Sequence, residues 1–238
     1  MKKLLPCALL LLLICACDKR KSTAPEESLQ VTYESAIADA VFADSAEICR
    51  RLVAIVPDNR GTVWSSDGGR VLVLTWTRYP SSFPTADTIT TSWGDLWVTT
   101  CPEMADSLRS ERTSAADFVG RAEEMLGLPP DQGYTHFAEL WVLPADLFRP
   151  AYDPEITDTE CGLNYPGNID PEYVGWFEDN IIYSYFPPRY PWTRLGYTYD
   201  WGGSDEIGMS EFVLRKGSSA IVKTTCTNDE FYLAEVAR

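Results

Sequence analysis

A tight-turn signal between two apolar runs at residues 62–78 is the feature that most constrains the fold. The runs TVWSS and RVLVLTWTR flank Asp67-Gly68-Gly69, and such turns between β-branched and aromatic runs are typical of β-hairpins. The stretch 71–74 is apolar at every position, so we expect a central strand covered on both faces. A similar pattern predicts a second hairpin in 209–226, which turns at Lys216-Gly217-Ser218.

Helices are predicted from capping residues and from apolar side chains at helical spacing. Asp44 and Glu47 form a capping-box pattern, and Pro102 and Pro171 stand where proline is favoured, at the start of a helix. We expect helices at 45–56, from Cys101, at 115–126 and from Pro171, and further strands at 95–100 and 136–142. For residues 33–43 the pattern leaves helix and strand open.

This mixed order of elements, with two hairpins, predicts an α+β fold. We expect one globular domain over residues 31–238, with a largely antiparallel sheet and three to four helices. The length fits a single domain of ordinary size.

The N-terminus reads as an export signal. A positive start, Met1-Lys2-Lys3, precedes the apolar run LLPCALLLLLICA, Cys17 and the charged residues DKRK. The run is shorter than the about 20 residues of a membrane span. Its end, Ile14-Cys15-Ala16-Cys17, resembles the lipobox of bacterial lipoproteins.

That resemblance implies cleavage before Cys17 and acyl chains on Cys17, which would anchor the protein to a membrane of the bacterial cell envelope. The alternative is an ordinary secretory signal that is cut elsewhere. Residues 18–30 are polar and lack aromatic side chains, so we expect a flexible tether.

The charge of the chain limits the kinds of partner that it can bind. The chain has 20 basic and 35 acidic residues and a net charge of −15. Such an acidic chain does not bind nucleic acid by default. We expect contact with the membrane through the lipid on Cys17, and an envelope ligand or protein as a further partner.

No motif for a cofactor or metal is present. The sequence lacks GxGxxG, P-loop and HExxH patterns and has a single histidine. We therefore expect no cofactor and no metal site.

Four cysteines follow the lipobox: Cys49, Cys101, Cys161 and Cys226. In an exported protein they could form two disulfides in any of three connectivities. Buried free thiols are the alternative, since reduced cysteine is among the most buried residue types.

Three residues are weak candidates for catalysis: His136, Glu139 and Glu211. A lone histidine is more often a hydrogen-bonded structural residue than a base. Glu139 and Glu211 stand among apolar residues, where burial would raise the pKa of a carboxyl, and two such acids could form a glycosidase pair. Ion pairs, for example with Arg194, would explain the same pattern.

Residues 193–201 alternate between large apolar and polar or small side chains. Period two predicts a half-buried strand, with Leu195 and the aromatic residues facing the core. Arg194, Thr198 and Asp200 would then lie on the opposite face as weak candidates for binding. Exposed aromatic side chains are expected from two loops, YPSSFP at 79–84 and SYFPPRYPW at 184–192.

Several long blocks resemble a family of uncharacterised bacterial proteins. They are LGLPPDQGYTHFAELWVLPADLFRP (126–150), CGLNYP (161–166), YVGWFEDN (173–180), YPWTRLGYTYDWG (190–202) and GMSEFVLRKGSSAIV (208–222). The resemblance carries no known activity, so it transfers no catalytic residue. Other members often have a cysteine near the position of Ala151; if it bonds the counterpart of Cys161 there, the resemblance implies that Cys161 is unpaired in this chain.

Three functions remain open. The preferred hypothesis is a lipid-anchored envelope protein whose domain binds a ligand or a protein without chemistry. The alternatives are an envelope hydrolase that uses Glu139 or Glu211, and a structural subunit of an envelope complex that docks through Arg194 and Asp200.

Overall fold

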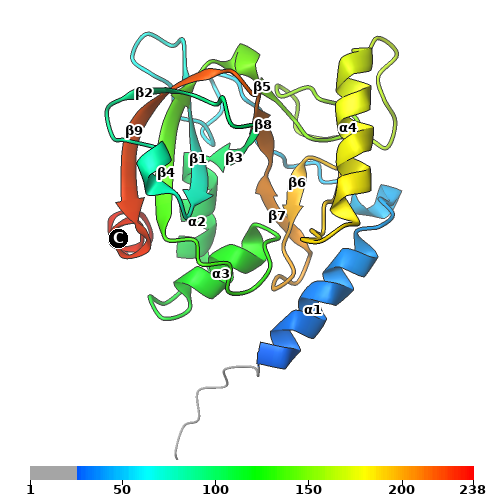
Figure 1. The fold of residues 1–238 in the computed structure, drawn as a ribbon, viewed down its shortest axis with the longest axis horizontal. Helices are drawn as coiled ribbons and strands as arrows, with labels where there is room; N and C mark the ends of the chain where they lie inside the picture. Colours follow the sequence, from blue (N-terminus) through cyan, green and yellow to red (C-terminus); the bar gives the residue numbers. More distant parts are fainter. Residues whose placement is uncertain (1–25) are drawn as a thin grey trace, which may run out of the picture.

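A computed structural model describes residues 26–238 of the chain, with side chains from residue 28 onward. The predicted signal peptide, the lipidation of Cys17 and residues 18–25 of the predicted tether lie outside the described residues. Helix α1 (Glu26–Asp39) begins within the predicted tether and settles the open assignment of 33–39 as helix. In Figure 1, α1 lies beside the lower end of α4 (Pro171–Ser184).

The protein is an α+β domain built on a largely antiparallel sheet, as predicted (Figure 1). Seven strands are ordered β2-β9-β4-β1-β3-β8-β5, and β6 and β7 form a small second sheet. The strands are β1 (Val71–Thr77), β2 (Thr88–Thr90), β3 (Leu96–Thr100), β4 (His136–Val142), β5 (Leu147–Phe148), β6 (Tyr197–Tyr199), β7 (Ile207–Ser210), β8 (Phe212–Leu214) and β9 (Ser219–Thr227).

Five α-helices and four other helical segments complete the described fold. Besides α1 and α4, the α-helices are α2 (Cys101–Ser110), α3 (Phe118–Met125) and α5 (Asn228–Phe231). Short 3₁₀ segments lie at Ser45–Glu47, Pro80–Ser82 and Pro144–Asp146, and a π-helical turn at Tyr232–Val236 follows α5.

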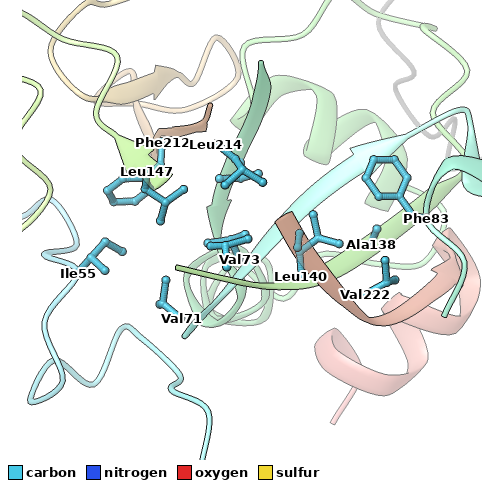
Figure 2. Close-up of a cluster of buried hydrophobic side chains, with 13 residues drawn as sticks. Ile55, Val71, Val73, Phe83, Ala138, Leu140, Leu147, Phe212, Leu214 and Val222 are labelled. Atoms are coloured by element: carbon cyan, nitrogen blue, oxygen red, sulfur yellow. The ribbon is translucent and has the colours of Figure 1, made fainter. Parts of the chain in front are cut away.

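Strand β1 is central, as its apolar sequence predicts. It pairs with β3 and β4, and all seven of its residues are buried. Because successive side chains point to opposite faces, Val71 and Val73 join one core (Figure 2), whereas Leu74 and Trp76 join a second core with α2, α3 and α5. Both faces of the sheet are therefore covered by apolar side chains.

The sheet is not flat, because a short connection joins two strands that are distant in it. Residues 215–218 link β8 to β9, although three strands lie between these two in the sheet. In a flat sheet, four strand spacings would separate β8 from β9 by roughly 19 Å. The five Cα–Cα steps from Leu214 to Ser219 can span only roughly 17 Å.

The predicted second hairpin is wrong. A tight turn does join β8 to β9, but the two strands pair with other strands and not with each other.

The predicted helix at 45–56 is also wrong beyond its first turn. The capping box of Asp44 and Glu47 is present but starts only the 3₁₀ segment Ser45–Glu47. The chain then runs alongside the loop that follows β5, where the amides of Leu52 and Ile55 donate to the carbonyls of Thr159 and Ile156. These tertiary hydrogen bonds replace the helical ones.

The first arm of the predicted first hairpin, residues 62–66, does not form a strand and keeps only an isolated bridge between Trp64 and Val71. The remaining predicted elements are confirmed within a few residues. They are the strands at 95–100 and 136–142 and the helices from Cys101, at 115–126 and from Pro171. Asp170 caps α4 by accepting a hydrogen bond from the amide of Glu172.

Among the described residues, no helix has the length and apolar character needed to cross a membrane. The hydrophobic cores are built from residues between Leu29 and Val236. A chain that begins at Asp18 therefore contains every residue of these cores.

Candidate functional site

A cavity of about 630 Å³ opens on the face of the sheet that also carries α2 and α3. Its walls come from β1 and β3, the end of α3, the C-terminal part of α4, the segment 186–192 and strand β6. This volume is typical of pockets that enclose a small organic ligand.

Aromatic rings dominate the lining of this cavity. Tyr183 and Phe186 are 69% and 61% exposed, so the α4 side of the cavity presents apolar rings to solvent. Trp76 is buried and stacks on Tyr134 with ring centroids 5.1 Å apart. The nine aromatic lining residues are Trp76, Trp97, Tyr134, Phe137, Tyr183, Phe186, Tyr190, Trp192 and Tyr199.

The segment SYFPPRYPW at 184–192 supplies much of one wall. Seven of its nine residues line the cavity: Ser184, Phe186, Pro187, Pro188, Tyr190, Pro191 and Trp192. Proline has no amide hydrogen to donate and disfavours the helical conformation in the residue before it, so α4 ends here. The sequence predicts exposed aromatics in this segment, but it gives no sign of the cavity that they face.

Glu211 lies between β7 and β8 and is one of the residues that line the cavity. Its amide donates to the carbonyl of Gly196 at 3.0 Å. Its carboxylate Oε2 is buried without a hydrogen-bond partner in the described part of the chain. Because the residue as a whole keeps intermediate exposure, we infer that its remaining accessible surface faces the cavity.

Burial raises the pKa of Glu211 to about 8. A carboxylate is costly to bury without a partner, and the group keeps its proton instead. At neutral pH the cavity wall therefore carries a protonated acid that can donate a hydrogen bond and can also ionise when a partner arrives.

Asp95 is the second carboxyl in the lining, and it is already engaged. It accepts hydrogen bonds from the indole Nε1 of Trp176 at 2.8 Å and from the amide of Lys216 at 2.7 Å. The lining residues include no lysine, arginine or histidine. The indole Nε1 of Trp192 is buried without a partner. The wall therefore holds an unsatisfied hydrogen-bond donor, at Trp192, as well as the unsatisfied Oε2 of Glu211.

His136 and Glu139 do not line this cavity. Glu139 Oε2 lies 2.6 Å from Lys223 Nζ, an ion pair by distance although its geometry falls short of a hydrogen bond. His136 Nδ1 lies 2.8 Å from the hydroxyl of Thr135. The structure therefore does not bring Glu139 and Glu211 together in the cavity as the expected carboxylate pair.

Arg194, Thr198 and Asp200 are all buried, so the expectation of an exposed polar face over 193–201 is wrong. Only 197–199 form a strand, and other parts of the chain cover both of its faces. Arg194 donates to the carbonyl of Ala40, and Asp200 accepts two hydrogen bonds from the guanidinium of Arg121.

Thr198 is the only one of these three residues that lines the cavity. Its hydroxyl donates to the carbonyl of Met125 and accepts from the amide of Met209 at 2.8 Å. These bonds tie β6 to α3 and β7, which fixes the wall beside Glu211.

The four cysteines of the described chain are free thiols. Cys161 packs in the same apolar cluster as Ala151 and Cys49, and burial raises its pKa to about 11. Over residues 26–238, no group of three or more histidine, cysteine, aspartate or glutamate residues could hold a metal ion.

Comparisons with protein-family models, with curated proteins and with solved structures each found no match. The membership of this chain in the uncharacterised bacterial family therefore stays a prediction from the sequence blocks.

Proposed function

We propose that the protein is a lipid-anchored binding protein of the bacterial cell envelope, which holds a small, largely apolar ligand in the cavity beside Glu211. The lipid on Cys17 would keep the domain at the membrane surface, where amphipathic molecules are concentrated.

The observation that carries the proposal is the cavity itself. A volume of about 630 Å³ with nine aromatic side chains in its lining is much larger than a packing defect in a close-packed core. Apolar walls with a few convergent polar groups are the usual composition of a small-molecule site.

The experiment is a thermal unfolding panel on the chain that begins at Asp18. Ten-carbon amphiphiles with a trimethylammonium, hydroxyl or carboxylate head are tested below their micelle concentrations. A ligand at 100 times its Kd stabilises by about 2.7 kcal/mol, which raises the Tm of a domain of this size by about 5–10 °C.

Two tryptophans provide a matched pair of variants. Trp97 lines the cavity, whereas Trp93 packs on Phe83 outside it, and both are partly exposed, at 37% and 52%. We expect Trp97→Ala to reduce the ligand-induced shift and Trp93→Ala to leave it unchanged. The proposal fails if no head group shifts the Tm, or if the two variants lose the shift equally.

A further inference from the structure

We propose that the ligand is an organic cation with an apolar body, and that Glu211 is its counter-ion within the aromatic cavity. This inference rests on the proposed function and specifies the chemistry of its ligand. Three independent features of the cavity support it: the sign of its ionisable groups, the nature of its rings and the state of the Glu211 carboxyl.

The ionisable groups of the lining favour a positive ligand. Asp95 and Glu211 are carboxyls, and no lysine, arginine or histidine lines the cavity. A ligand carboxylate or phosphate would meet these acids with no cationic side chain in the lining to compensate, which is costly in a poorly hydrated site. The acidic chain, with a net charge of −15, adds a weak long-range preference of the same sign.

The rings of the cavity match a cation as well as an alkyl chain. The face of an aromatic ring carries partial negative charge, and tryptophan and tyrosine faces attract ammonium groups by about 0.5–2 kcal/mol each. Trp76, Trp97 and Trp192 and four tyrosines line the cavity. An arrangement of this kind already occurs nearby, where the Arg78 guanidinium lies 5.0 Å from the centroid of the Tyr134 ring.

The carboxyl of Glu211 lacks a partner that a cation would supply. None of the hydrogen bonds or ion pairs of the described chain reaches its Oε2, which is nevertheless buried. A bound cation would stabilise the carboxylate form, so the proton of Glu211 would leave to solvent as the ligand enters. Binding below pH 8 would then release up to one proton for each cation bound.

Two other titratable groups near Glu211, Glu103 and Arg149, are not placed to meet the ligand, although burial raises the pKa of Glu103 as well. Glu103 accepts hydrogen bonds from the amide and hydroxyl of Ser210, and the buried Arg149 guanidinium contacts the carbonyl of Gly196. Both groups lie outside the lining.

Across the cavity, Asp95 is held by Trp176 and Lys216. Burial raises the pKa of the lining residues Tyr190 and Tyr199 above the ordinary tyrosine value, so these tyrosines stay neutral between pH 6 and 8.

The test uses decyltrimethylammonium, whose charge does not change with pH, and isothermal titration calorimetry on the chain from Asp18. Since the pKa of free Glu211 is about 8, the affinity should rise roughly 50-fold between pH 6 and pH 8. Titrations in two buffers of different ionisation enthalpy should show the release of about one proton at pH 6.5. Glu211→Gln should lose both the pH dependence and the proton release.

Decanol and decanoate separate this inference from the proposed function. If decanol or decanoate binds and the cation does not, the cavity is a ligand site and the cation inference is overturned. A cation affinity that is equal at pH 6 and 8, or unchanged in Glu211→Gln, also overturns it. If none of the three amphiphiles binds, the proposed function itself fails. Should Glu211→Gln unfold, the proton release of the wild-type chain alone decides the question.

Discussion

Replacement of Glu211 by glutamine should make the protein more stable at alkaline pH. In the folded protein burial raises the pKa of Glu211 from its ordinary 4.5 to about 8. Between these values the folded state holds a proton that the unfolded chain has lost. Folding stability therefore falls as pH rises through this window and is unaffected by Glu211 below about pH 4.5.

The size of the effect follows from the shift. Each unit of pKa shift corresponds to about 1.4 kcal/mol. The ionisation of Glu211 therefore lowers the free energy of unfolding by about 3 kcal/mol at pH 7, and by an amount that approaches about 5 kcal/mol above pH 8. Glutamine has the same size and no charge, so it removes the pH-dependent part. The difference in unfolding free energy between the variant and wild type should grow by about 1.2 kcal/mol per pH unit between pH 5 and 8.

Urea unfolding of the two proteins at pH 5, 6, 7 and 8 measures this difference. Other carboxyls titrate in both proteins, and their contributions cancel in the comparison. Glu178→Gln, which removes an exposed carboxylate from α4, is the control and should show no such slope. If the difference in unfolding free energy between wild type and Glu211→Gln is the same at every pH, the argument that Glu211 is buried without a partner is refuted.

Three further predictions concern other parts of the fold. Asp200→Asn should destabilise by about 3 kcal/mol in urea unfolding, because a buried carboxylate that binds Arg121 at 2.5 and 2.6 Å is lost; a change under 1 kcal/mol would contradict this. Gly196→Ala should lower the free energy of unfolding by about 3 kcal/mol or more, because φ is +83° and a Cβ would lie 2.5 Å from Cδ of Arg149. A Tm equal to that of the wild type would contradict this. Cys161 should react with iodoacetamide at pH 8 far more slowly in the folded protein than in urea, because burial raises its pKa to about 11; mass spectrometry that shows a disulfide at Cys161 would contradict the free thiol.

Elements with strong local signals could be predicted from the sequence. The apolar run 71–74 gave a central strand, and Asp170 with Pro171 gave the start of α4. These signals involve neighbours in the sequence, so tertiary contacts did not change them. The same kind of signal at Asp44 gave only a single 3₁₀ turn.

The errors arise where distant segments compete with local preference. Val53, in the mispredicted helix, donates its amide to the hydroxyl of Ser210, and its carbonyl accepts from buried Arg149. Likewise Arg194 is bound by Ala40, just after α1, and Asp200 by Arg121 of α3, so their period-two pattern did not mark an exposed face. No single sequence shows which distant segments will supply these partners.

At the candidate site, too, the sequence predicts local properties but not the contacts between distant segments. The apolar surroundings of Glu211 predict a raised pKa, which the structure supports. The cavity was not predicted, because its lining comes from segments between Leu74 and Glu211 that meet only in the folded chain. The aromatic segment 184–192 predicted exposed rings, but not the cavity that they face.

The ionisation of Glu211 measured with and without a cation tests the central claim most directly. Carboxyl ¹³C NMR of the chain from Asp18, with the Glu211 signal assigned by its loss in Glu211→Gln, would give the midpoint between pH 5 and 9. The account predicts a midpoint near 8 in the free protein and a clearly lower midpoint with saturating decyltrimethylammonium. A midpoint near the ordinary 4.5 in the free protein, or one that the cation leaves unchanged, would contradict it.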